Sequence, residues 1–196
     1  MIDFGISLDV ETLGTRDNVE IIQIGAALFH WMDEPGVMRE SMEFIVDPGP
    51  QIQNVEPYAA AMNWKILAAL GGYEADDPLE CPIILKEDAT EHLGDWIKSV
   101  WTMEDKVVFC GKNFSGFDRP KLERMPGWFD NIPKYHHRSP DPGSMFWRPS
   151  VDGLELPSTQ VCMERAGLSG VVAHTAEQDA IVVATLIQTW CQNENV

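Results

Sequence analysis

The sequence predicts a single α/β domain, covering residues 1–196, in which a mixed sheet is flanked by helices. Two observations indicate this class. Three strand-like segments joined by short polar turns open the chain, and strand-like and helical patterns alternate after them. The composition does not change along the chain in a way that would demand a second domain.

The first half of the sequence predicts an antiparallel three-strand meander. Strands are expected at Phe4–Thr12, Glu20–Trp31 and Met38–Val46, because each is a largely apolar run. Polar turns at Gly14–Asn18 and Asp33–Gly36 separate them, and turns this short join neighbouring antiparallel strands.

Helices alternate with strands in the rest of the chain. An Ala-rich helix is expected at Tyr58–Leu70 and an amphipathic helix at Lys86–Trp101, where apolar residues recur at spacings of three and four. The other expected elements are a strand at Lys106–Cys110, a short helix at Ser115–Arg124, and closing helices at Leu156–Ala166 and Thr175–Trp190. We expect Tyr73–Ile84 and Met125–Pro149 to be loops, the second with a short strand near Tyr135–Arg138. The strands after the meander are expected to add in parallel to the sheet.

Charge and composition narrow the function. A net charge of −17 weighs against non-specific binding of a polyanion. The segment Lys112–Arg138 carries six basic and three acidic residues, so it is either a contact for a phosphate chain or a solvated surface.

Four scattered cysteines are expected as free thiols rather than a zinc site. Without a secretion signal or an apolar run of roughly 20 residues, the expected place is the cytoplasm, away from membranes.

The first expected strand ends in a pair of carboxylates, Asp9 and Glu11. Strand side chains alternate between faces, so these two project from the same side. Carboxylates held together repel each other unless a cation lies between them, and hard divalent cations prefer oxygen ligands. The pair is therefore a candidate half-site for Mg²⁺ or Mn²⁺. The alternative is two solvated acids where a strand ends.

A capping box is predicted at the start of the last helix, with Thr175 as N-cap and Gln178 three residues later. This places His174 just before the cap and Asp179 at the fourth helical position, and these two positions pack side by side. The helix is apolar on most of its surface, so a buried Asp179 needs a cation or hydrogen-bond donors. The alternative is an acid favoured by the helix dipole.

Asp118 is the remaining acidic candidate. It follows the expected strand at Lys106–Cys110 and precedes Arg119-Pro120. Taken alone, this position favours an ordinary helix N-cap.

Three motifs together resemble a known family. They are Asp-x-Glu-Thr at Asp9–Thr12, Asn-x-x-x-Phe-Asp at Asn113–Asp118, and His-x-x-x-x-Asp-Ala at His174–Ala180. In order and separation they resemble the motifs of the DEDDh 3′-to-5′ exonucleases, which include ribonuclease T, oligoribonuclease and polymerase proofreading subunits. The small free-standing members carried by phages look most similar. Many relatives have a His where this chain has Lys112, so contacts there are expected to differ.

The resemblance implies a ribonuclease H-like fold and two divalent metal ions, Mg²⁺ or Mn²⁺. One ion would be held by Asp9, Glu11 and Asp179, and the other by Asp9 with Asp118. His174 would be the general base, since an unperturbed His titrates at roughly pH 6.5. The implied reaction removes nucleoside 5′-monophosphates from the 3′ ends of single-stranded DNA or RNA. The implied substrate contacts are Thr12, Leu13, Asn113, Phe117 and Lys112.

Further expectations follow from the same resemblance. Short single strands should bind better than duplexes, and Leu13 or Phe117 would wedge against the last base. Several relatives dimerise, which by analogy allows a homodimer. If a phage encodes the protein, its cytoplasmic location is that of the host cell.

Other functions stay open at this level. The chain could be an inactive nucleic-acid-binding module with the same fold, a ribonuclease H-type endonuclease, or a structural domain whose acids cap helices. The pair His136-His137 is expected to point to opposite faces rather than bind a metal. Trp64, Trp128 and Trp147 are expected to pack in the core or an interface rather than stack on bases.

Overall fold

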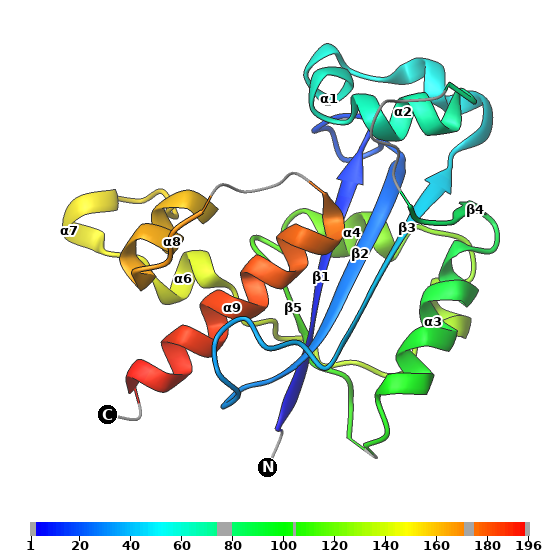
Figure 1. The fold of residues 1–196 in the computed structure, drawn as a ribbon. Coiled ribbons are helices and arrows are strands. Elements are labelled where there is room, and N and C mark those ends of the chain that lie inside the picture. Colours follow the sequence, from blue (N-terminus) through cyan, green and yellow to red (C-terminus); the bar gives the residue numbers. More distant parts are fainter. Residues whose placement is uncertain (1–2, 74–79, 104, 171–174, 195–196) are drawn as a thin grey trace.

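The computed structural model describes residues 3–73, 80–103, 105–170 and 175–194. At its centre lies a five-stranded sheet in the order β4–β3–β2–β1–β5 (Figure 1). The strands are β1 (Phe4–Thr12), β2 (Ile21–His30), β3 (Glu40–Asp47), β4 (Ile83–Leu85) and β5 (Phe109–Cys110). The first three form the predicted antiparallel meander, and β4 and β5 add in parallel to β3 and β1. The predicted mixed sheet is therefore confirmed.

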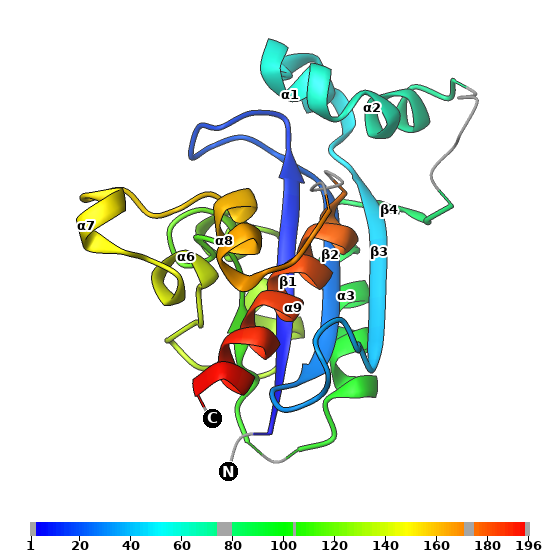
Figure 2. The same cartoon turned by 60° about the vertical axis from the view of Figure 1, so that its left-hand side comes forward.

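The two faces of the sheet bury different helices. Ile6, Leu8 and Val10 of β1 alternate toward the face that packs on α3 (Ala89–Val100). The opposite face is covered by α9 (Ala176–Glu194), whose apolar side chains cluster with Phe29. Figure 2 shows α9 crossing in front of β1 and β2, with α3 on the far side. Asp9 and Glu11 alternate with the apolar residues of β1, so they face α9.

Gly25 determines how closely α9 approaches the sheet. It pairs with Asp9 across the β1–β2 ladder. A Cβ atom at this position would lie 2.1 Å from both the carbonyl carbon of Ala176 and the nitrogen of Glu177. Only glycine leaves room for this backbone contact. The first turn of α9 is thereby seated on β2, next to the strand that carries Asp9.

The remaining helices lie around the sheet. They are the 3₁₀ helix η1 (Gly49–Asn54) and the α-helices α1 (Pro57–Met62), α2 (Trp64–Leu70), α4 (Asp118–Leu122), α5 (Trp128–Asn131), α6 (Pro142–Met145), α7 (Pro149–Asp152) and α8 (Thr159–Ala166). Helices α6, α7 and α8 form a group to one side of α9, and α1 and α2 lie beyond the ends of β1 and β2 (Figure 1).

Several predicted boundaries are wrong. The helix expected at Tyr58–Leu70 divides at Asn63, whose backbone leaves the helical region. The segment predicted as a loop up to Ile84 ends in β4. The strand expected near Tyr135–Arg138 is only an isolated bridge between Val107 and Tyr135. The segment 125–149, predicted to be mostly loop, contains α5, α6 and the start of α7.

The predictions for individual side chains have mixed outcomes. All four cysteines lie in the described part of the chain, and none forms a disulfide. Trp128 is 1% exposed and belongs to the core as predicted. Trp64 (53% exposed) and Trp147 (38%) lie at the surface, where packing in an interface stays a prediction. The rings of His136 and His137 stack at 5.2 Å instead of pointing to opposite faces. No helix in the described segments is both long and apolar enough to cross a bilayer.

Candidate metal centre

Four carboxylates from three distant parts of the chain line one pocket of about 280 Å³. Asp9 and Glu11 come from β1, Asp118 from the first residue of α4, and Asp179 from the first turn of α9. The sequence therefore folds so that the end of one strand meets the beginnings of two helices. This is the convergence of acidic residues that the motifs predict.

Three of the acids have the geometry of a metal site. One carboxylate oxygen each from Asp9, Glu11 and Asp179 lies within 4.8 Å of the other two, and all three residues are partly buried. Three oxygen donors this close together are suited to a hard divalent cation such as Mg²⁺ or Mn²⁺. The residues present thus fit the ion that the motifs imply.

Asp118 lies on the wall of the same pocket but outside this group of three. It is 3% exposed. The N-cap interpretation of Asp118 is wrong, because α4 begins at Asp118 itself and its N-cap, Phe117, makes no side-chain capping bond. Instead, the Asp118 carboxylate is oriented by backbone hydrogen bonds, one of them with Val10 of β1.

Burial and mutual repulsion disfavour the charged forms of these acids. Burial, followed by the charges of Asp118, Asp179 and Glu11, raises the pKa of Asp9 well above its ordinary value. Burial also raises the pKa of Glu11 to about 7, with further contributions from Asp179 and Glu43, against a hydrogen bond from Asn63 that lowers it. Burial raises the pKa of Asp118 to about 7. A cation in the pocket would reverse these shifts by neutralising the charges.

Two polar side chains that sequence reasoning missed hold the start of α9. The backbone N–H of Ala176 donates to Oε1 of Gln23, and that of Glu177 to Oε1 of Glu43, both at 3.1 Å. The predicted Thr175 cap also forms, with the N–H of Gln178 donating to Oγ1 at 3.4 Å. Gln23 is fully buried within the apolar run of strand β2, and that interruption of the run is the signal that could have identified it.

Asn63 is a third support that sequence reasoning missed. Its side chain hydrogen-bonds Glu11, and its Nδ2 donates to the carbonyl of Thr12 at 3.3 Å. Asn63 is 4% exposed. The break between α1 and α2 therefore brings a polar side chain to the end of β1.

The second motif builds the wall opposite α9. Lys112, Asn113 and Phe117 all line the pocket. Asn113 adopts a left-handed conformation (φ 56°), and its carbonyl accepts from the N–H groups of Gly116 and Phe117. This tight turn places Asp118 at the pocket. Thr159, at the start of α8, also lines the pocket and was not predicted.

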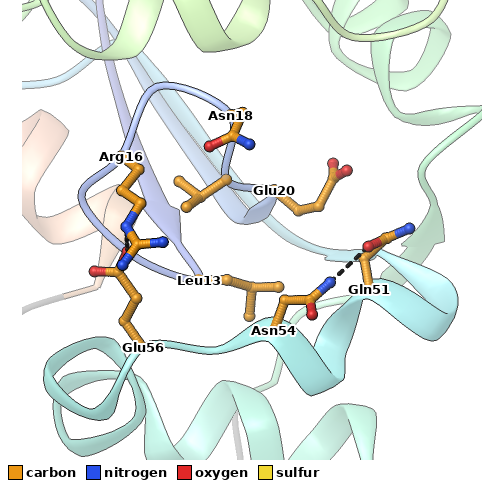
Figure 3. A pocket seen from close by; sticks show the side chains of 8 residues that line it. Leu13, Arg16, Asn18, Glu20, Gln51, Asn54 and Glu56 are labelled. Carbon is orange, nitrogen blue, oxygen red and sulfur yellow. Dashed lines mark hydrogen bonds and ion pairs between the residues drawn. The ribbon is translucent and has the colours of Figure 1, made fainter.

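Thr12 and Leu13, expected as substrate contacts, lie beyond the acids. Thr12 is buried and its hydroxyl donates to the carbonyl of Gly14 at 2.6 Å. Leu13 is 1% exposed and lines a second pocket of about 330 Å³ between the β1–β2 loop and η1 (Figure 3). The charged groups there have partners: Arg16 pairs with Glu56 at 3.2 Å, and Glu20 with Lys86 at 2.6 Å.

Only part of the basic segment reaches the acids. Of its six basic residues, Lys112 is the one that lines the acidic pocket. Arg119 instead binds Glu123 at 2.7 Å, and Lys121 is buried with its ammonium 3.4 Å from the centroid of the Phe117 ring.

His174 lies outside the described residues, so its predicted contact with Asp179 stays a prediction.

Solved structures share the fold of this chain. Zinc-bound exonuclease I of E. coli, in a complex with single-stranded DNA, matches with a TM-score of 0.57 and 16% identity. Exonuclease X, bound to a duplex with a 5′ overhang, matches at 0.56 and 17%, and the cell-death related nuclease CRN-4 at 0.62 and 18%. No protein-family model and no curated protein matches the sequence.

The matches cover the whole architecture of this chain. They extend over 100%, 97% and 95% of it, and over 41% of exonuclease I, 93% of exonuclease X and 62% of CRN-4. The chain thus spans about two fifths of exonuclease I and nearly all of exonuclease X. At these identities the likeness establishes the fold alone. It confirms the predicted α/β, ribonuclease H-like class.

Proposed function

We propose that this protein is a metal-dependent 3′-to-5′ exonuclease that hydrolyses single-stranded nucleic acid to nucleoside 5′-monophosphates. One observation carries the proposal: the oxygens of Asp9, Glu11 and Asp179 converge within 4.8 Å in a pocket that Asp118 also lines. The structural neighbours named as exonucleases support the class of reaction.

The acids would hold two divalent ions. Asp9, Glu11 and Asp179 would bind one ion, and Asp9 with Asp118 the second. When bound, such ions stabilise charge on the attacking and leaving oxygens of a displacement at phosphorus. Their positive charge would also reduce, at the site itself, the repulsion that a net charge of −17 exerts on a polyanion.

The remaining groups would bind the substrate and move a proton. His174 would accept the proton of the attacking water, a task suited to a group that titrates near neutral pH. Lys112 would place a positive charge beside the phosphate, and Phe117 would offer an apolar surface to the terminal nucleotide. These assignments follow from the motifs and from the lining of the pocket.

An end-labelled assay tests the proposal. Single-stranded DNA and RNA carrying a 5′ label are incubated with the protein in Mn²⁺ or in EDTA, and the products are separated by size. We expect a ladder that shortens from the 3′ end only with metal, and none with Asp9→Asn. Internal cuts would indicate an endonuclease, and binding without cleavage an inactive module; either result contradicts the proposal.

Strand preference is tested in the same assay. Exonuclease X is seen with a duplex that has a 5′ overhang, so the fold does not by itself restrict the substrate to single strands. We propose a preference for single strands because Lys112 is the one cation of the basic segment that lines the pocket, which leaves little charge to hold a second strand. Equal rates on blunt duplexes and on single strands of the same length would contradict this preference.

A further inference from the structure

The start of α9 is attached to the sheet by side chains rather than by apolar packing alone. Gln23 of β2 and Glu43 of β3 each accept one backbone N–H of the first helical turn. The side chain of Glu177 adds a third hydrogen bond, in which its Oε1 accepts from the hydroxyl of Ser41 on β3 at 2.5 Å. Three polar side chains of the sheet thus converge on two consecutive residues of the helix.

The acids of β1 and the side chains that bind the start of α9 belong to the same sets of cross-strand pairs. Gly25 stands between Asp9 of β1 and Glu43 of β3, and Gln23 pairs with Glu11. Directly opposite residues of antiparallel strands share a face. The ligands on β1 and the groups that hold α9 are therefore built on one rigid set of paired strands.

The attachment lies close to the third ligand. Asp179 is three residues after Ala176, which is less than one helical turn. The backbone contact at Gly25 sets the height of the helix above the sheet, and the bonds to Gln23 and Glu43 set its rotation and its position along β2. A shift of the first turn would move Asp179 away from Asp9 and Glu11.

We propose that Gln23 and Glu43 are positioning residues for the metal centre, which fix Asp179 at ligand distance from Asp9 and Glu11. This inference rests on the proposed function. It differs from simple stabilisation of the helix, because it requires metal affinity to depend on the two acceptor oxygens. Outer groups that orient ligands typically change metal affinity by about 10- to 100-fold when they are removed.

The test measures Mn²⁺ binding to the full chain by calorimetry, without substrate. Gln23→Met and Glu43→Met keep the side-chain volume but remove the acceptor, and Glu43→Gln keeps an acceptor. Gln188→Met is the matched control, since Gln188 is a fully buried amide on the same helix that binds the backbone of the β2–β3 turn, away from the acidic pocket. Circular dichroism and Tm without metal report folding.

We expect Gln23→Met to bind Mn²⁺ about 10- to 100-fold more weakly than wild type. Glu43→Met should bind it about 10- to 100-fold more weakly than Glu43→Gln, which loses the same charge but keeps the acceptor. Gln188→Met should lower Tm and leave the affinity unchanged. If both acceptor variants lower Tm but bind Mn²⁺ like wild type, the inference is wrong and the two side chains only stabilise the helix. If Gln23→Met does not fold, the inference is tested by comparing the Mn²⁺ affinities of Glu43→Met and Glu43→Gln, because Glu43 is only partly buried. Equal affinities would contradict the inference. Wild-type protein that binds no Mn²⁺ would overturn the proposed function as well.

Discussion

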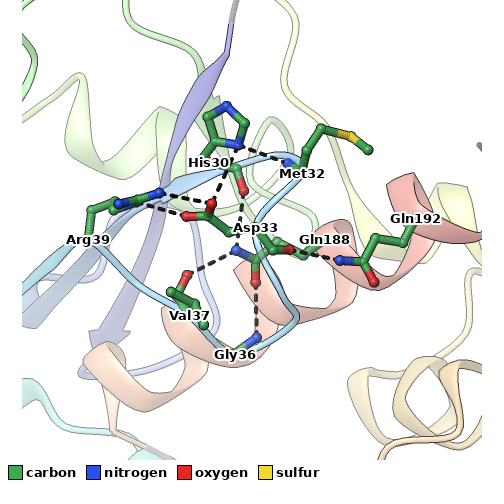
Figure 4. A network of polar contacts seen from close by, with 8 residues as sticks. All are labelled: His30, Met32, Asp33, Gly36, Val37, Arg39, Gln188 and Gln192. Atoms are coloured by element: carbon green, nitrogen blue, oxygen red, sulfur yellow. Dashed lines mark hydrogen bonds and ion pairs between the residues drawn. The ribbon is translucent and has the colours of Figure 1, made fainter.

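The two ends of α9 are joined to the sheet by contacts of opposite kind. At the N-terminal end, side chains of the sheet accept from the backbone of the helix, at Ala176 and Glu177. At the C-terminal end, side chains of the helix bind the backbone of the β2–β3 turn. The amide of Gln188 donates to Val37 O at 3.0 Å and to His30 O at 3.3 Å, and accepts from Gly36 N at 3.0 Å (Figure 4).

This difference indicates what each end holds in place. Gln188 and Gln192 reach out from a helix that is already packed, and they order the turn that connects β2 and β3. Gln23 and Glu43 belong to paired strands, and they order the helix itself. The end that carries Asp179 is therefore the one whose backbone position the sheet determines. Changes at the two ends should separate metal binding from stability.

The largest effect is expected at Asp179, the ligand that we propose α9 supplies. Asp179→Asn removes one of the three converging carboxylates. We expect Mn²⁺ to raise the Tm of the wild-type protein. In Asp179→Asn this gain should disappear and nuclease activity should fall by orders of magnitude, because the ion loses a charged donor. Glu164→Gln on α8 is the control, since it removes one exposed carboxylate away from the pocket. Full activity in Asp179→Asn would exclude Asp179 as a ligand.

A smaller loss of metal binding is expected from Gly25→Ala. The new methyl group would meet the backbone at Ala176 and Glu177 at 2.1 Å, so the first turn of α9 must move outward. Overpacking of this kind costs about 1–3 kcal/mol, and here we also expect weaker Mn²⁺ binding in a calorimetric titration. Gly72→Ala is the matched control: its positive φ (70°) strains the backbone, but nothing lies near its Cβ. Equal Mn²⁺ affinity in both variants would contradict the claim that the close contact between Gly25 and α9 positions the metal centre.

The other end of α9 should affect stability alone. Gln188→Met leaves the N–H of Gly36 and the carbonyls of His30 and Val37 without their buried partner. At about 1 kcal/mol for each lost bond, the free energy of unfolding should fall by about 2–3 kcal/mol in urea titrations. The affinity for Mn²⁺ should not change. A loss of affinity as large as that of Gly25→Ala would remove the distinction between the two ends.

The smallest effect is a pH dependence of the metal-free protein. The pKa of Glu11 and that of Asp118 are raised to about 7 in the folded chain, so between pH 5 and 7 the folded state binds more protons than the unfolded state. The stability from these two groups is therefore present at low pH and lost as pH rises through about 7. Urea unfolding in EDTA should show this fall, with a shallower slope for Asp118→Asn. A rise in stability over the same range would contradict the shifted values.

The metal-free protein and the Mn²⁺ complex should differ in the sign of this trend. Metal binding requires the charged carboxylates, so it releases protons and strengthens as pH rises. In saturating Mn²⁺ the fall in stability between pH 5 and 7 should therefore vanish or reverse.

The meander and the convergence of Asp9, Glu11 and Asp179 could be predicted because their signals are local. Alternation in β1 places Asp9 and Glu11 on one face, and the Thr175 cap fixes the register of Asp179. Taken alone, the position of Asp118 predicts a helix cap, and only the resemblance to the exonucleases indicates a place at the metal site. Its burial against Val10 depends on β5 pairing with β1, a long-range contact that no local pattern encodes.

The supports of the site could not be predicted for the same reason. Glu43 lies in a strand with other acids, and its role arises only when α9 crosses β3. Asn63 breaks a helix whose composition favours continuity, and its contacts with Glu11 and Thr12 are tertiary contacts that no local pattern encodes. Helices α5, α6 and α7 have four residues each, too few for a periodic signal.

The most direct test of the central claim is anomalous diffraction from crystals soaked in Mn²⁺. We expect a strong peak among the carboxylates of Asp9, Glu11 and Asp179, with a second between Asp9 and Asp118. Crystals of Asp179→Asn should lose the first peak. A wild-type pocket that shows no anomalous density at saturating Mn²⁺ would contradict the account.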